Sequence, residues 1–112
     1  MGYFPFFIDI RGKSCIVVGG GRVALRKLEK LLPFEPDITV VAPDICDEIY
    51  RLDNIKILKK KYEDTDIHSA FMVISATDNA ELNRHIFELC TQNGILVNTV
   101  DDKRYCTFVG LQ

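Results

Sequence analysis

The sequence predicts an α/β domain built on a doubly wound parallel sheet. Short, continuously apolar segments alternate with segments of helical spacing along the chain, and strands that are apolar throughout are typical of parallel sheets covered on both faces. Three consecutive glycines stand where the first strand passes into the first helix. The 112 residues, 47% of them hydrophobic, suffice for one substantial core and are too few for two. We therefore expect residues 1–112 to form a single domain.

The first strand and helix are predicted from the sequence SCIVVGGGRVALRKLEKLL. Ser14–Val18 is short, mostly apolar and followed by glycine, as a buried strand is. A helix is expected from about Val23 to Leu32, and Pro33 is expected to end it. Its apolar stripe consists of Ala24, Leu25, Leu28, Leu31 and Leu32.

The middle of the chain repeats this alternation with shorter elements. Asp37–Ala42 reads as a second apolar strand, and Ile55–Leu58 as a third, weaker one. Between them, Pro43 and Asp44 begin a turn and a short helix that runs to about Arg51. A helical turn is expected near residues 64–68.

The last strands and the last helix are predicted from residues 71 to 100. Phe71–Ser75 and Ile95–Val100 are apolar strands. Asp78, with Glu81 three residues later, makes a capping box for the helix between them. Asn93 and Gly94 supply its left-handed end. The apolar face of this helix carries Leu82, Ile86, Leu89 and Cys90.

The glycines at positions 19, 20 and 21 indicate a Rossmann-like dinucleotide site. Gly19, Gly21 and Ala24 fit G-x-G-x-x-G/A after the first strand and at the start of the first helix. In that motif the first glycine permits the tight turn, the second lets a pyrophosphate approach the main chain, and the third small residue lets the helix lie close to the strand. The alternative is a glycine-rich turn that binds nothing.

The end of the second strand bears on the choice of cofactor. NAD-binding domains usually offer an acidic residue at the strand end for the ribose hydroxyls, whereas this chain reads VVAPD, with Asp44 two residues late. Asp44 would repel a 2′-phosphate, which favours NAD over NADP, while Arg22 argues the other way. A helix N-cap is the alternative role for Asp44. Thr77 follows the fourth strand at the same edge and is a further candidate.

Composition excludes several classes of function. A formal charge of −2 and a pI near 5.6 give no bulk attraction for nucleic acid or an anionic membrane. No apolar stretch approaches the length of a membrane span and no signal segment is recognisable, which predicts a cytoplasmic location. The four cysteines form no CxxC pair and are expected to be reduced structural thiols. Since neither histidine has a partner at ligand spacing, we assign no metal site.

Four segments carry a resemblance to a known family: GGGRVALRK, VVAP, SATDNAELN and VNTVDD. Together they resemble the N-terminal dehydrogenase domain of siroheme synthase, also found as a separate precorrin-2 dehydrogenase that is often joined to sirohydrochlorin ferrochelatase activity. The resemblance implies NAD-dependent oxidation of precorrin-2 to sirohydrochlorin. It also implies contacts to the cofactor from Arg22, Val23, Pro43 and Asp44.

The resemblance further implies that Asp101, which closes VNTVD, is the catalytic general base. Without the family, a turn-forming aspartate would be the preferred interpretation. The substrate of the family carries many carboxylates, so Lys103 and Arg104 are candidates to receive them, as are the lysines at positions 59–61. For the lysine run, a solvated strand end is the preferred alternative.

The family continues beyond the last residue of this sequence into a dimerisation segment and a helical region. We therefore expect a homodimer in the full-length protein, with part of the tetrapyrrole pocket contributed from outside these 112 residues. The competing hypothesis is a nucleotide-binding sensor or regulatory module without turnover. Such sensors normally keep an acid at the end of the second strand, where this chain has Ala42 and Pro43.

Overall fold

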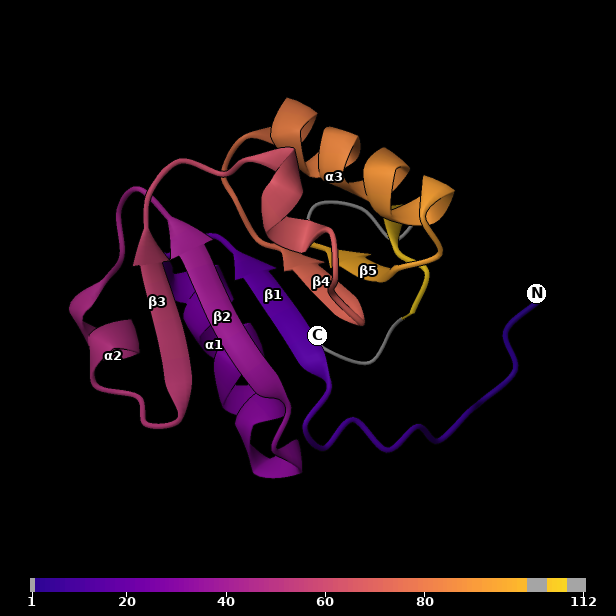
Figure 1. Ribbon diagram of the computed structural model, residues 1–112, viewed down its shortest axis with the longest axis horizontal. Coiled ribbons are helices and arrows are strands. Elements are labelled where there is room, and N and C mark those ends of the chain that lie inside the picture. The colour runs from indigo at the N-terminus through magenta and orange to yellow at the C-terminus, as the bar shows by residue number, and fades with distance from the viewer. Residues whose placement is uncertain (1, 101–104, 109–112) are drawn as a thin grey trace.

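The computed structural model describes residues 2–100 and 105–108, which contain a five-stranded parallel sheet with helices on both faces (Figure 1). The strand order is β3-β2-β1-β4-β5, and every neighbouring pair is parallel. The chain moves outward from β1 to β3 and then crosses to β4 on the other side of β1. This reversal makes the carboxyl ends of β1 and β4 the place where an open α/β sheet binds ligands. The predicted doubly wound fold is confirmed.

The elements follow the predicted order with small changes of boundary. The strands are β1 (Ser14–Val18), β2 (Asp37–Ala42), β3 (Ile55–Lys59), β4 (Met72–Ser75) and β5 (Leu96–Thr99). The α-helices are α1 (Arg22–Leu31), α2 (Asp47–Tyr50) and α3 (Ala80–Gln92), and the 3-10 helices are η1 (Leu32–Phe34) and η2 (Asp64–Ile67).

The two faces of the sheet bury separate apolar clusters. Side chains alternate across a strand, so Val17 of β1 packs on the face covered by α1 and α2, and Val18 on the face covered by α3 and η2. Leu28 of α1 and Ile86 of α3 are fully buried at the centres of these contacts. Because both faces are covered, the inner strands had to be apolar at successive positions, which is the pattern the sequence displays.

The N-cap of α3 and the role of Pro33 differ from the prediction. Asp78 does not cap α3, because Asn79 occupies the N-cap position and its Oδ1 accepts a hydrogen bond of 3.1 Å from the Leu82 N–H. Pro33 lies inside η1, a tight extension of the first helix, since a proline at the start of a helical turn lacks only an N–H that would be unpaired there. Gly94 has φ of 68°, which confirms the left-handed end of α3.

Residues 105–108 run along the outer edge of β5. The Thr107 N–H donates to the Val97 carbonyl at 2.7 Å, and the Val97 N–H donates to Thr107 Oγ1 at 2.9 Å. The buried Asn98 amide donates to the Phe108 carbonyl at 3.0 Å and accepts from Lys27 Nζ of α1 at 3.2 Å. These bonds occupy edge groups of β5 that would otherwise remain unpaired.

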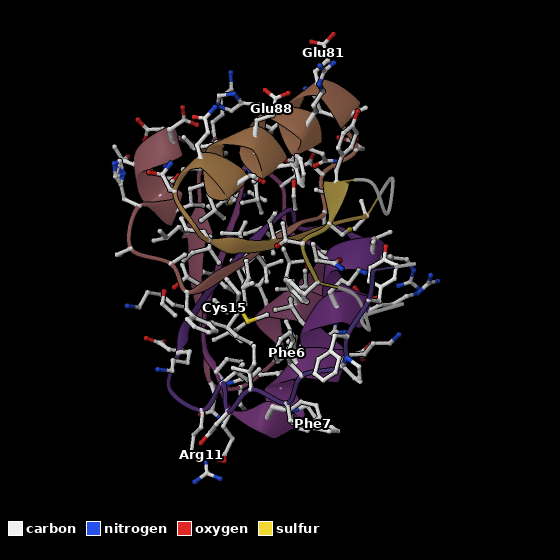
Figure 2. The ribbon with its side chains drawn as sticks, turned by 90° about the vertical axis from the view of Figure 1, so that its right-hand side faces the viewer. Phe6, Phe7, Arg11, Cys15, Glu81 and Glu88 are labelled. Atoms are coloured by element: carbon white, nitrogen blue, oxygen red, sulfur yellow. The ribbon has the colours of Figure 1, made fainter. Side chains whose placement is uncertain are left out.

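The four cysteines are free thiols, as predicted. Cys15 lies inside the molecule, between α1 and the sheet, whereas Glu81 and Glu88 point outward from α3 (Figure 2). Burial raises the pKa of the Cys15 and Cys90 thiols to about 12, so both are protonated at neutral pH. These two thiols therefore behave as small core side chains.

The N-terminal segment before β1 extends away from the body of the molecule (Figure 1). Its aromatic side chains are exposed, and Phe7 has a relative exposure of 102%. Within the described residues, no helix is long and apolar enough to span a membrane.

Candidate cofactor-binding cleft

A cleft of about 1020 Å³ opens at the carboxyl ends of β1, β2 and β4. Its wall is formed by the loop after β1, the loop after β2, the loop after β4 and the segment after β3. All eight residues predicted to bind the cofactor line this cleft: Gly19, Gly20, Gly21, Arg22, Val23, Pro43, Asp44 and Thr77. The topology therefore brings together side chains from three strand ends that are far apart in the sequence.

Gly19 and Gly20 are required by the packing of the loop itself. Gly19 has φ of 132°, and a Cβ there would collide with the backbone carbonyl of Ala76 after β4. A Cβ at Gly20 would collide with the carbonyl of Asp44 after β2. These two glycines line the cleft, and they also let three backbone segments meet at one point.

Gly21 differs, because it faces open space. Among the described residues, a Cβ at this position would meet no atom within 4 Å, and its φ of −99° is available to any residue. Gly21 is the N-cap of α1, whose first turn holds no acidic residue, and no side chain of residues 2–100 or 105–108 caps the helix. The first N–H groups of a helix carry partial positive charge and attract anions. The space above Gly21 therefore fits a phosphate group.

The loop between β2 and α2 forms the second wall. The Cys46 N–H donates to the Gly20 carbonyl at 2.8 Å, which binds this loop to the glycine loop. Pro43 and Asp44 are exposed to the cleft. Asp44 is not a helix cap, because α2 begins at Asp47 and Cys46 occupies the N-cap position.

An ion pair joins the same two loops at their outer ends. Arg22 Nη1, on the first residue of α1, lies 3.1 Å from Glu48 Oε2 of α2. A backbone hydrogen bond and the charge of Arg22 hold the pKa of Glu48 below its usual range, so the carboxylate is ionised at neutral pH. Glu48 was not predicted from the sequence, because the two residues are separated by 26 positions and no local pattern links them.

Asn83 organises the third wall and was also missed. Its Oδ1 accepts hydrogen bonds from Ser75 Oγ and from Thr77 Oγ1, both at 2.7 Å, and its Nδ2 donates to the Thr77 carbonyl at 3.0 Å. Asn83 is 1% exposed. A signal existed in the sequence, since Asn83 precedes Ile86 and Cys90 at helical spacing on the apolar face. The Thr77 hydroxyl is therefore engaged within this network, while the residue lines the cleft.

The lysines after β3 have different environments. Lys60 Nζ lies 2.7 Å from Asp66 Oδ2 and 3.0 Å from Glu63 Oε1, and these bonds raise its pKa. Lys60 is thus paired with two carboxylates of the segment before β4. Lys61, by contrast, lines the cleft and is exposed.

A polar cluster stands beside the cleft on the α3 side. His85 Nε2 of α3 lies 2.9 Å from Asp64 Oδ1 of η2, and this contact lowers the pKa of Asp64. Burial raises the pKa of the Tyr62 phenol, and the nearby Asp64 carboxylate raises it further. The partner of His85 is 21 positions away, so local spacing could not identify it.

The end of β5 leads to the predicted catalytic position. Val100 lines the cleft, and its N–H donates to the Ser75 carbonyl at 3.1 Å. Asp101 lies outside the described residues, as do Lys103 and Arg104. Their assignments remain predictions from the resemblance.

The chain is similar to known proteins across nearly its whole length. It is 44% identical to siroheme synthase of Thioalkalivibrio sulfidiphilus over 112 residues, a match that covers 97% of this chain and 23% of that protein. Siroheme synthase of Ruthia magnifica is also 44% identical, with 97% of this chain and 24% of that protein covered. The chain thus spans about a quarter of the length of these relatives. The resemblance indicated by the four sequence segments is confirmed.

Among solved structures, the precorrin-2 dehydrogenase SirC superposes with a TM-score of 0.79 at 29% identity, covering 89% of this chain and 50% of that chain. A family model described as "Putative NAD(P)-binding" matches residues 6–110. The chain belongs to this NAD(P)-binding family.

Proposed function

We propose that the cleft binds NAD, with the pyrophosphate held at the N-terminus of α1. The observation that carries this proposal is the open space above Gly21, next to helix N–H groups that no side chain in the described part of the chain caps. Arg22 and Val23 flank this position, and Pro43, Asp44 and Thr77 border it from the neighbouring strand ends. Val23 is 44% exposed and gives the cleft an apolar surface for a nucleotide ring or ribose.

The reaction that best fits this site is oxidation of precorrin-2 to sirohydrochlorin. The similarity to SirC and to siroheme synthases supports this substrate. Bound NAD supplies the hydride acceptor. One hydride and one proton leave the substrate in each oxidation, so the chain needs a base near the nicotinamide end of the cleft.

Asp101 is our candidate for that base. It directly follows Val100, which lines the cleft, and β5 lies on the side of β4 away from β2. In dinucleotide-binding sheets the adenosine lies at the β2 side of the switch point and the nicotinamide beyond it. A carboxylate after β5 is therefore suited to accept the proton that accompanies hydride departure.

We further propose that the protein acts in the cytoplasm and that its full-length form is a homodimer with a tetrapyrrole pocket completed outside these 112 residues.

Lys61 is a candidate to receive a substrate or cofactor anion, because it is exposed and lines the cleft. Ferrochelatase activity of the full-length protein is a separate question, answered by incubation of sirohydrochlorin with ferrous iron.

The test is anaerobic incubation of the full-length protein with precorrin-2 and NAD, with NADH formation followed by absorbance. We expect NADH to form, and the Asp101→Asn variant to lose at least about 100-fold in kcat, the scale of a general base, while keeping its affinity for NAD. Equal rates in the two proteins would remove Asp101 from the mechanism. Nucleotide binding without turnover in the unaltered full-length protein would favour the sensor hypothesis.

A further inference from the structure

The ion pair between Arg22 and Glu48 lies at the edge of the cleft. Arg22 is the first residue of α1 and lines the cleft, and Glu48 belongs to α2, immediately after the second loop of the cleft. Their side-chain atoms Nη1 and Oε2 are 3.1 Å apart. The adenosine ribose of a dinucleotide lies at the end of the second strand, so this pair stands beside the position of the ribose 2′-oxygen.

The geometry of the pair is set by rigid backbone contacts. The Cys46 N–H donates to the Gly20 carbonyl at 2.8 Å, and Gly20 packs directly against the backbone of Asp44 and Ile45. The two loops are thus fixed to each other at the main chain. This contact between the loops keeps the side chains of Arg22 and Glu48 close enough to pair.

The charged residues that line the cleft affect whether a ribose with a 2′-phosphate or one with a free 2′-hydroxyl can bind. Arg22 and Lys61 are cationic, Asp44 and Asp78 are anionic, and Glu48 adds a carboxylate next to Arg22. A 2′-phosphate brings a charge of about −1.5 to −2 at neutral pH. To bind it, Arg22 would have to exchange Glu48 for the phosphate, and the released carboxylate would remain beside the new anion. A free 2′-hydroxyl requires no such exchange.

We propose that Glu48 is a specificity-determining residue: by engaging Arg22, it withholds the guanidinium from a 2′-phosphate and so makes the cleft select NAD over NADP. This inference rests on the proposed cofactor site and names the residue that decides which form of the cofactor enters. Asp44 opposes a 2′-phosphate only by its charge, whereas Glu48 makes a defined contact with Arg22.

The test compares the affinities of the full chain for NAD and NADP by calorimetry. The Glu48→Gln variant should gain at least about tenfold in affinity for NADP relative to NAD, because it frees Arg22 and removes one negative charge. The gain should shrink at high salt, since the pair is exposed. Adding Arg22→Gln to this variant should abolish the gain. Glu88→Gln is the matched control, because it breaks a similar ion pair, with Arg84 on the outer face of α3.

The outcomes separate this inference from the proposed function. A Glu48→Gln variant whose preference stays the same, or whose affinity for NADP falls, overturns the role of Glu48. A gain that persists in the double variant overturns the role of Arg22 and points to Lys61. If the unaltered chain binds neither nucleotide, the cofactor site itself is refuted and this inference fails with it. Binding of NAD with the same preference in all variants refutes only the inference.

Discussion

At the scale of single residues, the three consecutive glycines have three different reasons to be glycine. Gly19 needs a positive φ, Gly20 needs the absence of a Cβ for close backbone approach, and Gly21 has room for a side chain. Only the third leaves a space that a ligand can fill. In this motif, packing therefore requires glycine at positions 19 and 20, while at position 21 glycine leaves room for the proposed phosphate.

This difference predicts opposite effects of the same substitution at neighbouring positions. Gly20→Ala forces a Cβ into the backbone of Asp44 and should lower the free energy of unfolding by about 1–3 kcal/mol, as overpacking does. Gly21→Ala should change it by less than about 1 kcal/mol, the scale of an N-cap change. Gly21→Ala should nevertheless weaken nucleotide binding at least about tenfold, because the added methyl group occupies the proposed phosphate position.

Urea unfolding and nucleotide titration of both variants would check this pair of expectations. The idea is wrong if Gly21→Ala binds nucleotide as well as the unaltered chain does, or if it unfolds as easily as Gly20→Ala.

At the scale of elements, the link between β4 and α3 is polar. Asn83 joins Ser75 at the end of β4 to Thr77 in the following loop, and it is almost fully buried. A buried polar group that loses its partner costs about 1–3 kcal/mol. The orientation of the third wall of the cleft therefore depends on one amide.

Asn83→Ala should lower the free energy of unfolding by about 2–4 kcal/mol, because it leaves the buried Ser75 hydroxyl without its acceptor, removes one of the two acceptors of the Thr77 hydroxyl and opens a cavity. Asn79→Ala is the matched control at the start of the same helix, and loss of its cap should cost about 1 kcal/mol. Denaturant titrations of the two variants provide the comparison. Equal losses would show that the amide network has no more weight than an ordinary helix cap.

At the scale of the whole molecule, two apolar cores lie on opposite faces of one sheet, and each contains a buried thiol. Cys15 belongs to the core under α1, and Cys90 to the core under α3. Burial raises the pKa of each from 9.0 to about 12. The folded chain therefore holds protons on both thiols over a pH range in which the unfolded chain releases them.

The sign of the resulting pH dependence follows by linkage. Because the folded pKa is raised, the contribution of each thiol to stability is fully present below pH 9 and is lost as the pH rises towards 12. Each thiol should add a slope of up to about 1.4 kcal/mol per pH unit in this range. Cys15→Ala should have a lower free energy of unfolding at neutral pH, because the substitution leaves a cavity. Its free energy of unfolding should also fall less steeply as the pH rises above 9. Unfolding free energies at several alkaline pH values would test it, and an unchanged slope in the variant would contradict it.

Much of the fold could be predicted because its signals are local. The bounds of β1 and β2 agree with the prediction, since apolar runs ended by glycine or proline leave little choice of register. The N-cap of α3 was predicted one residue too early, because Asp78 and Asn79 are both good capping residues. The backbone conformation decides which side chain accepts a hydrogen bond from the first turn of the helix. Helix ends depend on such small differences, while strand positions depend on burial.

The sequence by itself determined the parallel sheet and the glycine loop, because apolar periodicity and glycine placement act between neighbours in the chain. The sequence motifs and the resemblance together named eight of the residues that line the cleft. Only the tertiary structure decided that Glu48 meets Arg22, that Asn83 joins Ser75 to Thr77, and that His85 meets Asp64. Polar side chains choose partners by distance and direction in space. The sequence does not contain that information until the crossover connections bring remote segments to the same edge of the sheet.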